Sequence, residues 1–235
     1  QALKALVPVE SCKVAEGAKL LENIFRSVNI ALVNELKVIY EKMGIDIWQV
    51  IEAAKTKPFG FMPFYPGPGL GGHCIPIDPF YLSWKAREFG QDTRFIELAG
   101  EINTSMPQYV IEVCLRALDD QSKSVKDCKI LILGLAYKPN VDDDRESPTY
   151  VLIEKLEALG GDVSYNDPHI PKISQTREHS HLAGRTSVDI SDSFDLVLIA
   201  TNHSQYSDVD FSKFKCPVVD TRNCVQNLPA RYYKA

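Results

Sequence analysis

The sequence predicts an α/β protein in two parts: a helical first part of residues 1–120 and a second part of residues 121–235 built on a parallel sheet. Two observations support this. Residues 13–43 carry apolar side chains at spacings of three and four, which is typical of a helix. After residue 128, short apolar runs alternate with a helical pattern, which is typical of parallel strands joined by helices. The polar stretch 119–127 is the predicted linker.

Composition sets limits on the function. The chain has 235 residues, 45% hydrophobic and 24% charged, as in soluble globular proteins. Its net charge of −5 argues against nucleic-acid binding through bulk charge. The six cysteines show no CxxC spacing, so reduced thiols and a cytoplasmic location are expected rather than zinc or disulfides. The sequence has no apolar stretch of about 18 residues, so no membrane span is predicted.

The chain opens with Gln1 and an apolar run over residues 5–9. We expect this opening to continue something upstream, as in a fragment or a processed product.

The first part is predicted to contain several helices. The helix over 13–43 ends before Gly44, and its apolar residues occupy more than one side. Such a helix packs either against a partner subunit or wholly within its own domain, and the pattern does not decide between the two. Shorter helices are expected over 46–55, capped by Asp46, and over 80–89. A further helical stretch runs over 93–118, where Pro107 either kinks one helix or begins a second one.

The second part is predicted to form a sheet. Strands are expected over Lys129–Leu133, 162–165, 196–200 and Val218–Asp220, with a helix over 148–159. Ser147 and Pro148 are suited to the N-cap and first position of that helix. The stretch 168–191 reads as a surface loop, and its histidines show no metal-ligand spacing, so no metal is predicted.

The loop over residues 66–78 reads PGPGLGGHCIPID and has four glycines and three prolines in thirteen residues. That density of helix and strand breakers predicts a built loop, with Cys74 set among glycines and His73. Asp78 follows four residues later. A thiol on a rigid loop beside a carboxylate indicates a nucleophile with a partner that activates water, whereas an isolated cysteine is more often a buried structural residue.

Two other groups of residues suggest a site. Lys19, Asn23 and Arg26 lie on one face of the predicted first helix, where the alternative is a solvated polar stripe. The stretch 134–148 reads GLAYKPNVDDDRESP and begins at a strand end, with Lys138 and Arg145 in it. This arrangement indicates an anion site at the carboxyl edge of a sheet, and the alternative is a loop whose acids pair with its own cations.

These motifs resemble the nucleotide-sugar 6-dehydrogenases of the UDP-glucose dehydrogenase superfamily. GPGLGGHCIPID resembles their active-site cysteine loop, and the longer run over 57–90 resembles the branch that oxidises UDP-N-acetylglucosamine. The segment AKLLENIFRSVNIALVNELK resembles their helix with a catalytic lysine and asparagine, and GLAYKPNVDDDRESP resembles their C-terminal motif. The resemblance implies a helical central domain followed by a Rossmann-like UDP-sugar-binding domain.

The resemblance also implies roles for individual residues. The catalytic residues are Cys74 as nucleophile, Lys19 and Asn23 as oxyanion holders, and Asp78 at the hydrolytic water. The residues implied at the UDP-sugar are Arg26, Tyr65, Gly67, Gly71, Tyr137, Lys138 and Arg222. Arg145 and Cys74 are implied on the NAD side. Related enzymes pair through the helix over 13–43, so a homodimer or larger homo-oligomer is expected.

The dinucleotide fingerprint GxGxxG after a strand is absent from this sequence. The family has its NAD fingerprint in an N-terminal domain, which we expect to be missing here. The expected function is NAD-dependent four-electron oxidation of the C6 hydroxyl of a UDP-sugar, UDP-N-acetylglucosamine first, for surface polysaccharide precursors. The alternatives are UDP-glucose or UDP-N-acetylmannosamine as substrate, a UDP-sugar-binding dimerisation module without catalysis, and a redox-sensing thiol protein.

Overall fold

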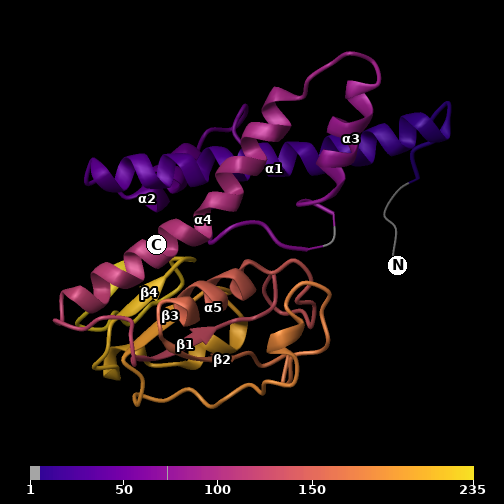
Figure 1. Cartoon of the computed structure of the whole chain (residues 1–235). Coiled ribbons are helices and arrows are strands. Elements are labelled where there is room, and N and C mark those ends of the chain that lie inside the picture. The colour runs from indigo at the N-terminus through magenta and orange to yellow at the C-terminus, as the bar shows by residue number, and fades with distance from the viewer. Residues whose placement is uncertain (1–5, 73) are drawn as a thin grey trace.

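A computed structural model of the chain describes residues 6–72 and 74–235. Figure 1 shows a helical half packed on a sheet half. The helices are α1 (Cys12–Lys42), α2 (Ile47–Ala54), α3 (Asp78–Arg87), α4 (Arg94–Asp119) and α5 (Pro148–Ala158). The strands are β1 (Lys129–Leu133), β2 (Asp162–Asn166), β3 (Leu196–Ile199), β4 (Val218–Asp220) and β5 (Tyr232–Lys234). The mixed α/β fold with a parallel sheet confirms the predicted fold class.

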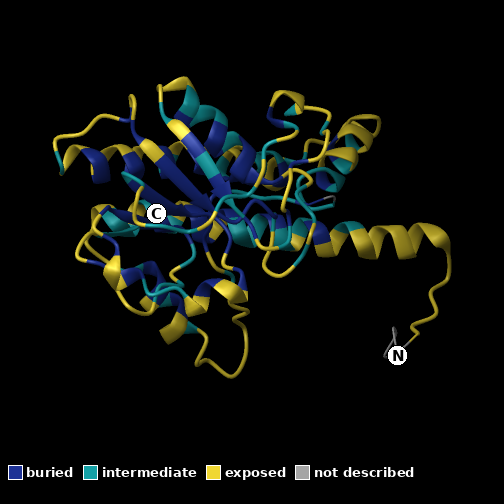
Figure 2. Ribbon diagram, turned by 90° about the horizontal axis from the view of Figure 1, so that it is seen from below, coloured by how far each residue is buried: buried dark blue, intermediate teal, exposed yellow. Residues whose placement is uncertain are grey.

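Helix α1 buries a polar face and exposes most of its apolar one. Its buried residues are Asn23, Ser27, Ala31, Val33, Asn34 and Lys37. Large apolar residues at the expected spacing are exposed instead, among them Leu21 at 67%, Phe25 at 44%, Leu32 at 51% and Ile39 at 45%. Figure 2 shows the first turns of α1 as an exposed helix that extends beyond the rest of the chain. The alternative of a helix buried wholly within its own domain is therefore wrong for the described residues.

Helix α4 connects the two halves without a break. It runs through Pro107, so of the two alternatives for this proline the one that begins a second helix is wrong. Pro107 is buried, and its ring lies close to Gly69 of the cysteine loop. Upstream of Pro107, α4 packs against α1, and downstream its buried residues join the core beneath the sheet. The halves therefore share one continuous helix, which crosses from one to the other in Figure 1.

The sheet has the strand order β2-β1-β3-β4-β5, and every neighbouring pair is parallel. Helices α4 and α5 pack on one face through Ile130, Ile132 and Leu198. Short 3-10 turns cover the other face, where Tyr206, Phe211 and Phe214 contact Leu131 and Val197. Because the strands are parallel, the loops after β1, β2, β3 and β4 all meet at one carboxyl edge.

Several local predictions are confirmed and a few boundaries move. Asp46 caps α2, Ser147 caps α5 with Pro148 behind it, and Gly44 ends α1 with a left-handed φ of 71°. Helix α3 begins at Asp78, two residues earlier than expected. The sequence pattern did not predict strand β5. Within the described residues, no helix is both long and apolar enough to cross a bilayer.

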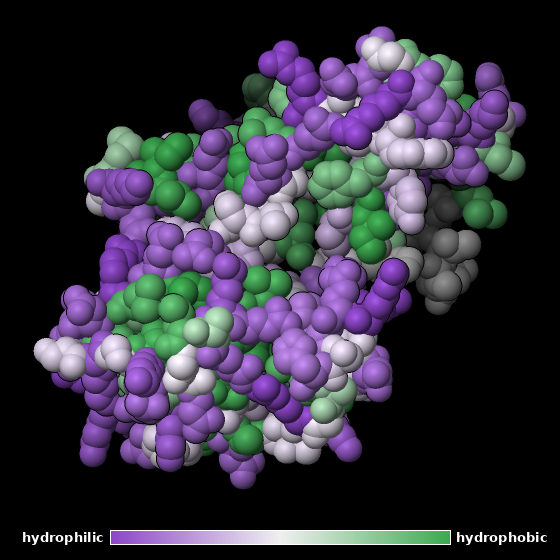
Figure 3. All heavy atoms as spheres, viewed as in Figure 1, coloured by the Kyte–Doolittle hydropathy of each residue, from purple (hydrophilic) through white to green (hydrophobic). Residues whose placement is uncertain are grey.

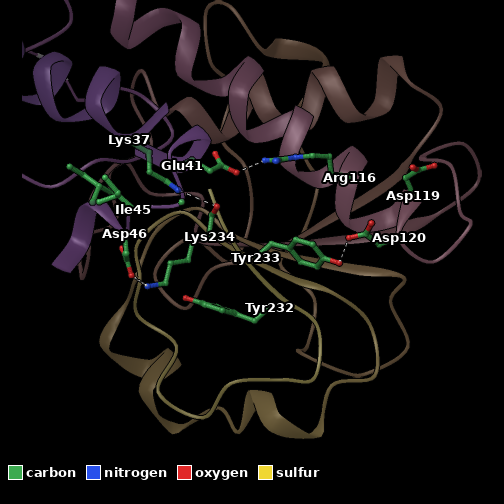
Figure 4. Close-up of a pocket in the computed structure, with 12 residues that line it drawn as sticks. Lys37, Glu41, Ile45, Asp46, Arg116, Asp119, Asp120, Tyr232, Tyr233 and Lys234 are labelled. Carbon is green, nitrogen blue, oxygen red and sulfur yellow. Dashed lines mark hydrogen bonds and ion pairs between the residues drawn. The ribbon is translucent and has the colours of Figure 1, made fainter. Parts of the chain in front are cut away.

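A charged pocket of about 480 Å³ lies where the ends of α1 and α4 meet β5. Figure 4 shows two bonds that cross between the halves, from the Lys37 side chain to the Lys234 carbonyl and from the Lys234 side chain to Asp46. A third bond, from Arg116 to Glu41, joins α4 to α1 within the helical half. Burial lowers the pKa of Lys37, although Glu41 and Asp46 act against this. The two bonds that involve Lys234 connect the helical half to the sheet half.

Candidate active site

The cysteine loop leads directly into α3. Cys74 is half-buried, and its carbonyl accepts the backbone N–H of Asp78 at 2.8 Å, which places the thiol and the carboxylate one turn apart. Asp78 is also the first residue of α3. His73, between Gly72 and Cys74, lies outside the described residues.

Helix α1 contributes an amide to this carboxylate. The Asn23 side chain is fully buried, and its Nδ2 donates to Asp78 Oδ2 at 2.7 Å. Its Oδ1 accepts a hydrogen bond from the Arg26 guanidinium at 2.6 Å. The structure therefore brings Asp78 to Asn23, which is 55 residues away in sequence, and Arg26 joins the pair from the same helix as Asn23. Lys19, one turn earlier on α1, is exposed to solvent.

Glycines let the cysteine loop approach the sheet half closely. A Cβ on Gly71 would lie 2.6 Å from Tyr137 Cβ and 2.9 Å from the Glu146 carbonyl. Gly72 has a φ of 90°, and its N–H donates to the Arg145 carbonyl at 2.9 Å. Only glycine fits these two positions without displacing the neighbouring loop. The thiol loop is thus held against the stretch that carries Tyr137 and Arg145.

At Gly67 the loop approaches Arg222, another predicted substrate residue of the sheet half. The guanidinium of Arg222 lies where a Gly67 side chain would project, and Arg222 Nε donates to the Ala200 carbonyl at 2.7 Å. Burial lowers the pKa of Arg222 to about 10, so it still carries its charge at neutral pH. A cation fixed between the two halves is suited to bind an anionic ligand.

Tyr65 borders a second hollow at this place, of about 470 Å³, which Arg222 also lines. Its ring stacks on Trp48 with centroids 5.8 Å apart, and its hydroxyl donates to Glu52 at 2.9 Å. Figure 3 shows the surface hollowed between the two halves, and a cavity of about 250 Å³ there is lined by the cysteine loop, α4 and the start of α5.

The other two predicted cations of the sheet half, Lys138 and Arg145, lie at the surface. Lys138 is exposed, with Nζ 5.2 Å from the centroid of the Tyr137 ring. Arg145 binds Asp143 through two hydrogen bonds of 2.8 and 2.6 Å, and these bonds raise the pKa of Arg145. The alternative of an internally paired loop thus holds for Arg145.

Two buried asparagines near the site were missed by the sequence reasoning. Asn34 Oδ1 accepts the backbone N–H of Gly67 at 3.0 Å, and its Nδ2 donates to Asn103 Oδ1 at 2.9 Å. Asn103 in turn donates to the Ser27 carbonyl at 3.1 Å. The available signal was the spacing of Asn23, Ser27 and Asn34 on one face of α1. This polar face is not solvated; it supports the cysteine loop.

The fold and the site define a class of protein with a half-buried cation, Arg222, after a strand of a parallel sheet and with a cysteine loop that a helical half holds against the same edge. Two family models match: the central domain of the UDP-glucose/GDP-mannose dehydrogenase family over residues 13–105, and its UDP-binding domain over residues 131–227. The chain belongs to the UDP-glucose/GDP-mannose dehydrogenase family.

Curated relatives agree with this membership. The chain is 35% identical over 201 residues to a UDP-N-acetyl-D-glucosamine 6-dehydrogenase of Pseudomonas aeruginosa, a match that covers 85% of this chain and 46% of the relative. It is 36% identical over 221 residues to a UDP-N-acetyl-D-mannosamine dehydrogenase of Methanocaldococcus jannaschii, over 90% of this chain and 47% of the relative. The chain thus spans about half the length of these curated relatives.

A solved structure is similar in fold across nearly the whole chain. The structure of a UDP-D-ManNAc dehydrogenase from Pyrococcus horikoshii matches with a TM-score of 0.85 at 29% identity, and the match covers 99% of this chain and 54% of that one.

Proposed function

We propose that this chain is the central and UDP-sugar-binding part, residues 1–120 and 121–235, of an NAD-dependent UDP-sugar 6-dehydrogenase. The reaction is the four-electron oxidation of the sugar C6 hydroxyl to a carboxylate, in the cytoplasm, for surface polysaccharide precursors. The observation that carries the proposal is the convergence of Cys74, Asp78 and Asn23 with Tyr137 and Arg222 across the two halves.

The cations and the loop would hold the UDP-sugar. Arg222 and Lys138 are suited to the diphosphate, because fixed cations favour phosphate oxygens. Tyr65, stacked on Trp48, offers a ring face beside Arg222 for the nucleoside. The loop backbone comes close to the sheet half at Gly67 and Gly71, the latter beside Tyr137. Arg26 donates a hydrogen bond to the Asn23 amide oxygen and so orients it. In this arrangement C6 of the sugar faces the thiol.

The residues of the helical half would perform the covalent steps. At the aldehyde level, the Cys74 thiolate adds to C6, and the resulting oxyanion is held by Lys19 and by the Asn23 amide. At the thioester level, Asp78 positions the water that releases the acid and restores the thiol. The 2.7 Å bond between Asn23 and Asp78 supports this division of roles, because the amide and the carboxylate are in contact.

NAD does not fit the first turn of this sheet. The amides of Leu135 and Ala136, at the position where a dinucleotide fold binds pyrophosphate, both donate to the buried Asp167 carboxylate at 2.7 and 2.9 Å. In our proposal Arg145, exposed near the loop, and Cys74 are the contacts of this chain to NAD, whose main site belongs to another domain. When bound, NAD accepts the two hydrides.

The named relatives differ in substrate. A relative named for UDP-N-acetylglucosamine is 35% identical to this chain, and one named for UDP-N-acetylmannosamine is 36% identical. We place UDP-N-acetylglucosamine first and UDP-N-acetylmannosamine or UDP-glucose as alternatives. A UDP-sugar-binding dimerisation module without catalysis is the alternative from another class.

Homo-oligomerisation is part of the proposal. The exposed apolar residues of α1, from Leu21 to Ile39, form a stripe along a 31-residue helix. A second copy packed on this stripe would remove it from water.

The test is a count of NADH per sugar consumed, with the chain joined to an NAD-binding domain of the family. We expect two NADH per UDP-N-acetylglucosamine, and at most one with Cys74→Ser, because the thiol reacts only after the first hydride has been transferred. UDP-sugar binding without NADH would support the binding module instead. The same count with the other two UDP-sugars ranks the substrates.

A further inference from the structure

Asp167, just after β2, is a buried carboxylate with an unusually full set of donors. Its side chain is inaccessible to solvent. Oδ1 accepts two backbone N–H groups of its own loop, and Oδ2 accepts two more from the loop after β1 and one from an imidazole. The donors and distances are His169 N (2.8 Å), Ile170 N (3.1 Å), Leu135 N (2.7 Å), Ala136 N (2.9 Å) and His203 Nε2 (3.0 Å). The site proposed above does not use this cluster.

The hydrogen bonds of this cluster fix the tautomer of the His203 imidazole. Its Nδ1 lies 3.0 Å from the backbone N of Asn140, and a backbone amide can only donate. Nδ1 therefore carries a lone pair, and the ring proton is on Nε2, where it donates to Asp167. His203 is thus a neutral connector between Asp167 and Asn140. Two other titratable groups face its ring, His169 with centroids 4.9 Å apart and Tyr206 with centroids 5.5 Å apart.

Asn140 ends the loop that begins at Leu135. Its backbone has a left-handed φ of 60°, and its Oδ1 accepts hydrogen bonds from the N–H of Ser204 at 2.9 Å and from its hydroxyl at 3.0 Å. The start of the loop is held by Asp167 directly, and the end is held by Asp167 through His203. Between these two attachments stand Tyr137 and Lys138.

We propose that His203 is a positioning residue for Lys138, and hence for UDP-sugar binding. This inference rests on the proposed function, since it takes the UDP diphosphate as the ligand of Lys138. His203 fixes the far end of a six-residue loop, and a long cationic side chain binds a phosphate well only when its backbone is fixed. Without the bond to His203, the Asn140 backbone loses its link to Asp167, and that end of the loop is held through the bonds between the Asn140 side chain and Ser204.

Two substitutions of His203 test the roles of its two ring nitrogens one at a time. His203→Asn leaves an acceptor near the position of Nδ1 and removes the donor to Asp167, which keeps its four backbone donors. His203→Gln leaves a donor near the position of Nε2 and removes the acceptor for Asn140. The probe is UDP-N-acetylglucosamine, titrated by calorimetry into the 235-residue chain. Exchange of the Asn140 amide, followed by NMR, reports the hydrogen bond without reference to binding.

We expect His203→Gln to weaken binding about tenfold and to speed exchange of the Asn140 amide, and His203→Asn to restore both in large part. In a Lys138→Ala background, His203→Gln should have no further effect on affinity, because its effect acts through Lys138. Asn140→Ala keeps the backbone amide that donates to His203, but it removes the bonds to Ser204 and puts alanine at a left-handed φ, so it should also weaken binding.

The outcomes separate the two proposals. If the unsubstituted chain does not bind the UDP-sugar, the proposed function fails. If it binds, and both His203→Gln and Asn140→Ala bind equally well, the positioning role is overturned. The role is also overturned if His203→Gln weakens binding as much in the Lys138→Ala background, since the effect then reaches the ligand by another path.

Discussion

Single glycines and single carboxylates set the geometry of this site. Gly67 is the sharpest case, because any side chain there would meet the guanidinium of Arg222. We predict that Gly67→Ala displaces Arg222 and weakens UDP-sugar binding by about tenfold or more, measured by calorimetry. Gly17→Ala is the matched control, since Gly17 lies in α1 with no atom within 4 Å of an added Cβ. It should leave binding unchanged and stabilise the chain by about 0.5–1 kcal/mol. Equal binding by Gly67→Ala would contradict the close contact.

The buried carboxylate of Asp167 predicts a pH dependence of stability. Burial alone would raise the pKa of Asp167, but hydrogen bonds from His203 and from backbone amides outweigh it and hold the pKa below the ordinary 3.8. A lowered folded-state pKa gives stability that is present above the ordinary value and lost as pH falls through the folded value. Asp167→Asn should therefore cost about 1–3 kcal/mol of unfolding free energy at pH 7, and the cost should shrink below about pH 4. Urea unfolding at several pH values measures it, and a cost that grows in acid would refute the assignment.

At the scale of elements, helix α1 supports the site through its polar face. Asn34→Ala would leave the Gly67 amide and the Asn103 side chain without their buried partner. We predict a loss of about 1–3 kcal/mol in unfolding free energy, because unpaired buried polar groups are costly. Asn29→Ala is the control: Asn29 bonds only the Phe25 carbonyl of its own helix, at an exposed position, and should change stability by less than about 0.5 kcal/mol. Similar losses for the two variants would argue against the buried amide network.

Most elements could be predicted from the sequence, because their signals are local. The apolar run of β1, the Ser147-Pro148 start of α5 and the Asp46 cap of α2 each lie within a few residues. Strand β5 could not be predicted this way, because three residues without an apolar run become a strand only by pairing with β4. Pro107 is typical of a kink or a break in a helix, but α4 continues through Pro107 because it packs against partners on both sides of this residue.

The site was predictable only in part, for the same reason. The Cys74 to Asp78 spacing and the shared face of Asn23 and Arg26 are local patterns, and the structure brings Asn23, Arg26 and Asp78 together. The contact of Gly67 with Arg222 joins loops about 150 residues apart and depends on how the halves pack. The buried side of α1 was assigned to its apolar residues, although its polar residues are the ones that meet the cysteine loop.

At the scale of the whole molecule, the exposed stripe on α1 predicts self-association. Leu32 is 51% exposed at the middle of the helix. We predict that Leu32→Glu shifts the chain from dimer to monomer in sedimentation velocity, because a buried unpaired charge is costly at an apolar interface. Lys213→Gln, at a side chain that is 80% exposed in the sheet half, should leave the mass unchanged. A monomeric unsubstituted chain, or a Leu32→Glu variant that stays dimeric, would contradict this.

The most direct test of the account is the affinity of the 235-residue chain for UDP-N-acetylglucosamine, measured by calorimetry with Arg222→Gln and Arg231→Gln beside it. Arg222 is fixed between the two halves at Gly67, whereas Arg231 lies at the surface and donates to the Lys215 carbonyl. The account predicts that the chain binds the UDP-sugar, that Arg222→Gln weakens binding at least about tenfold, and that Arg231→Gln leaves it unchanged. No binding by the unsubstituted chain, or equal binding by all three proteins, would contradict a UDP-sugar site between the two halves.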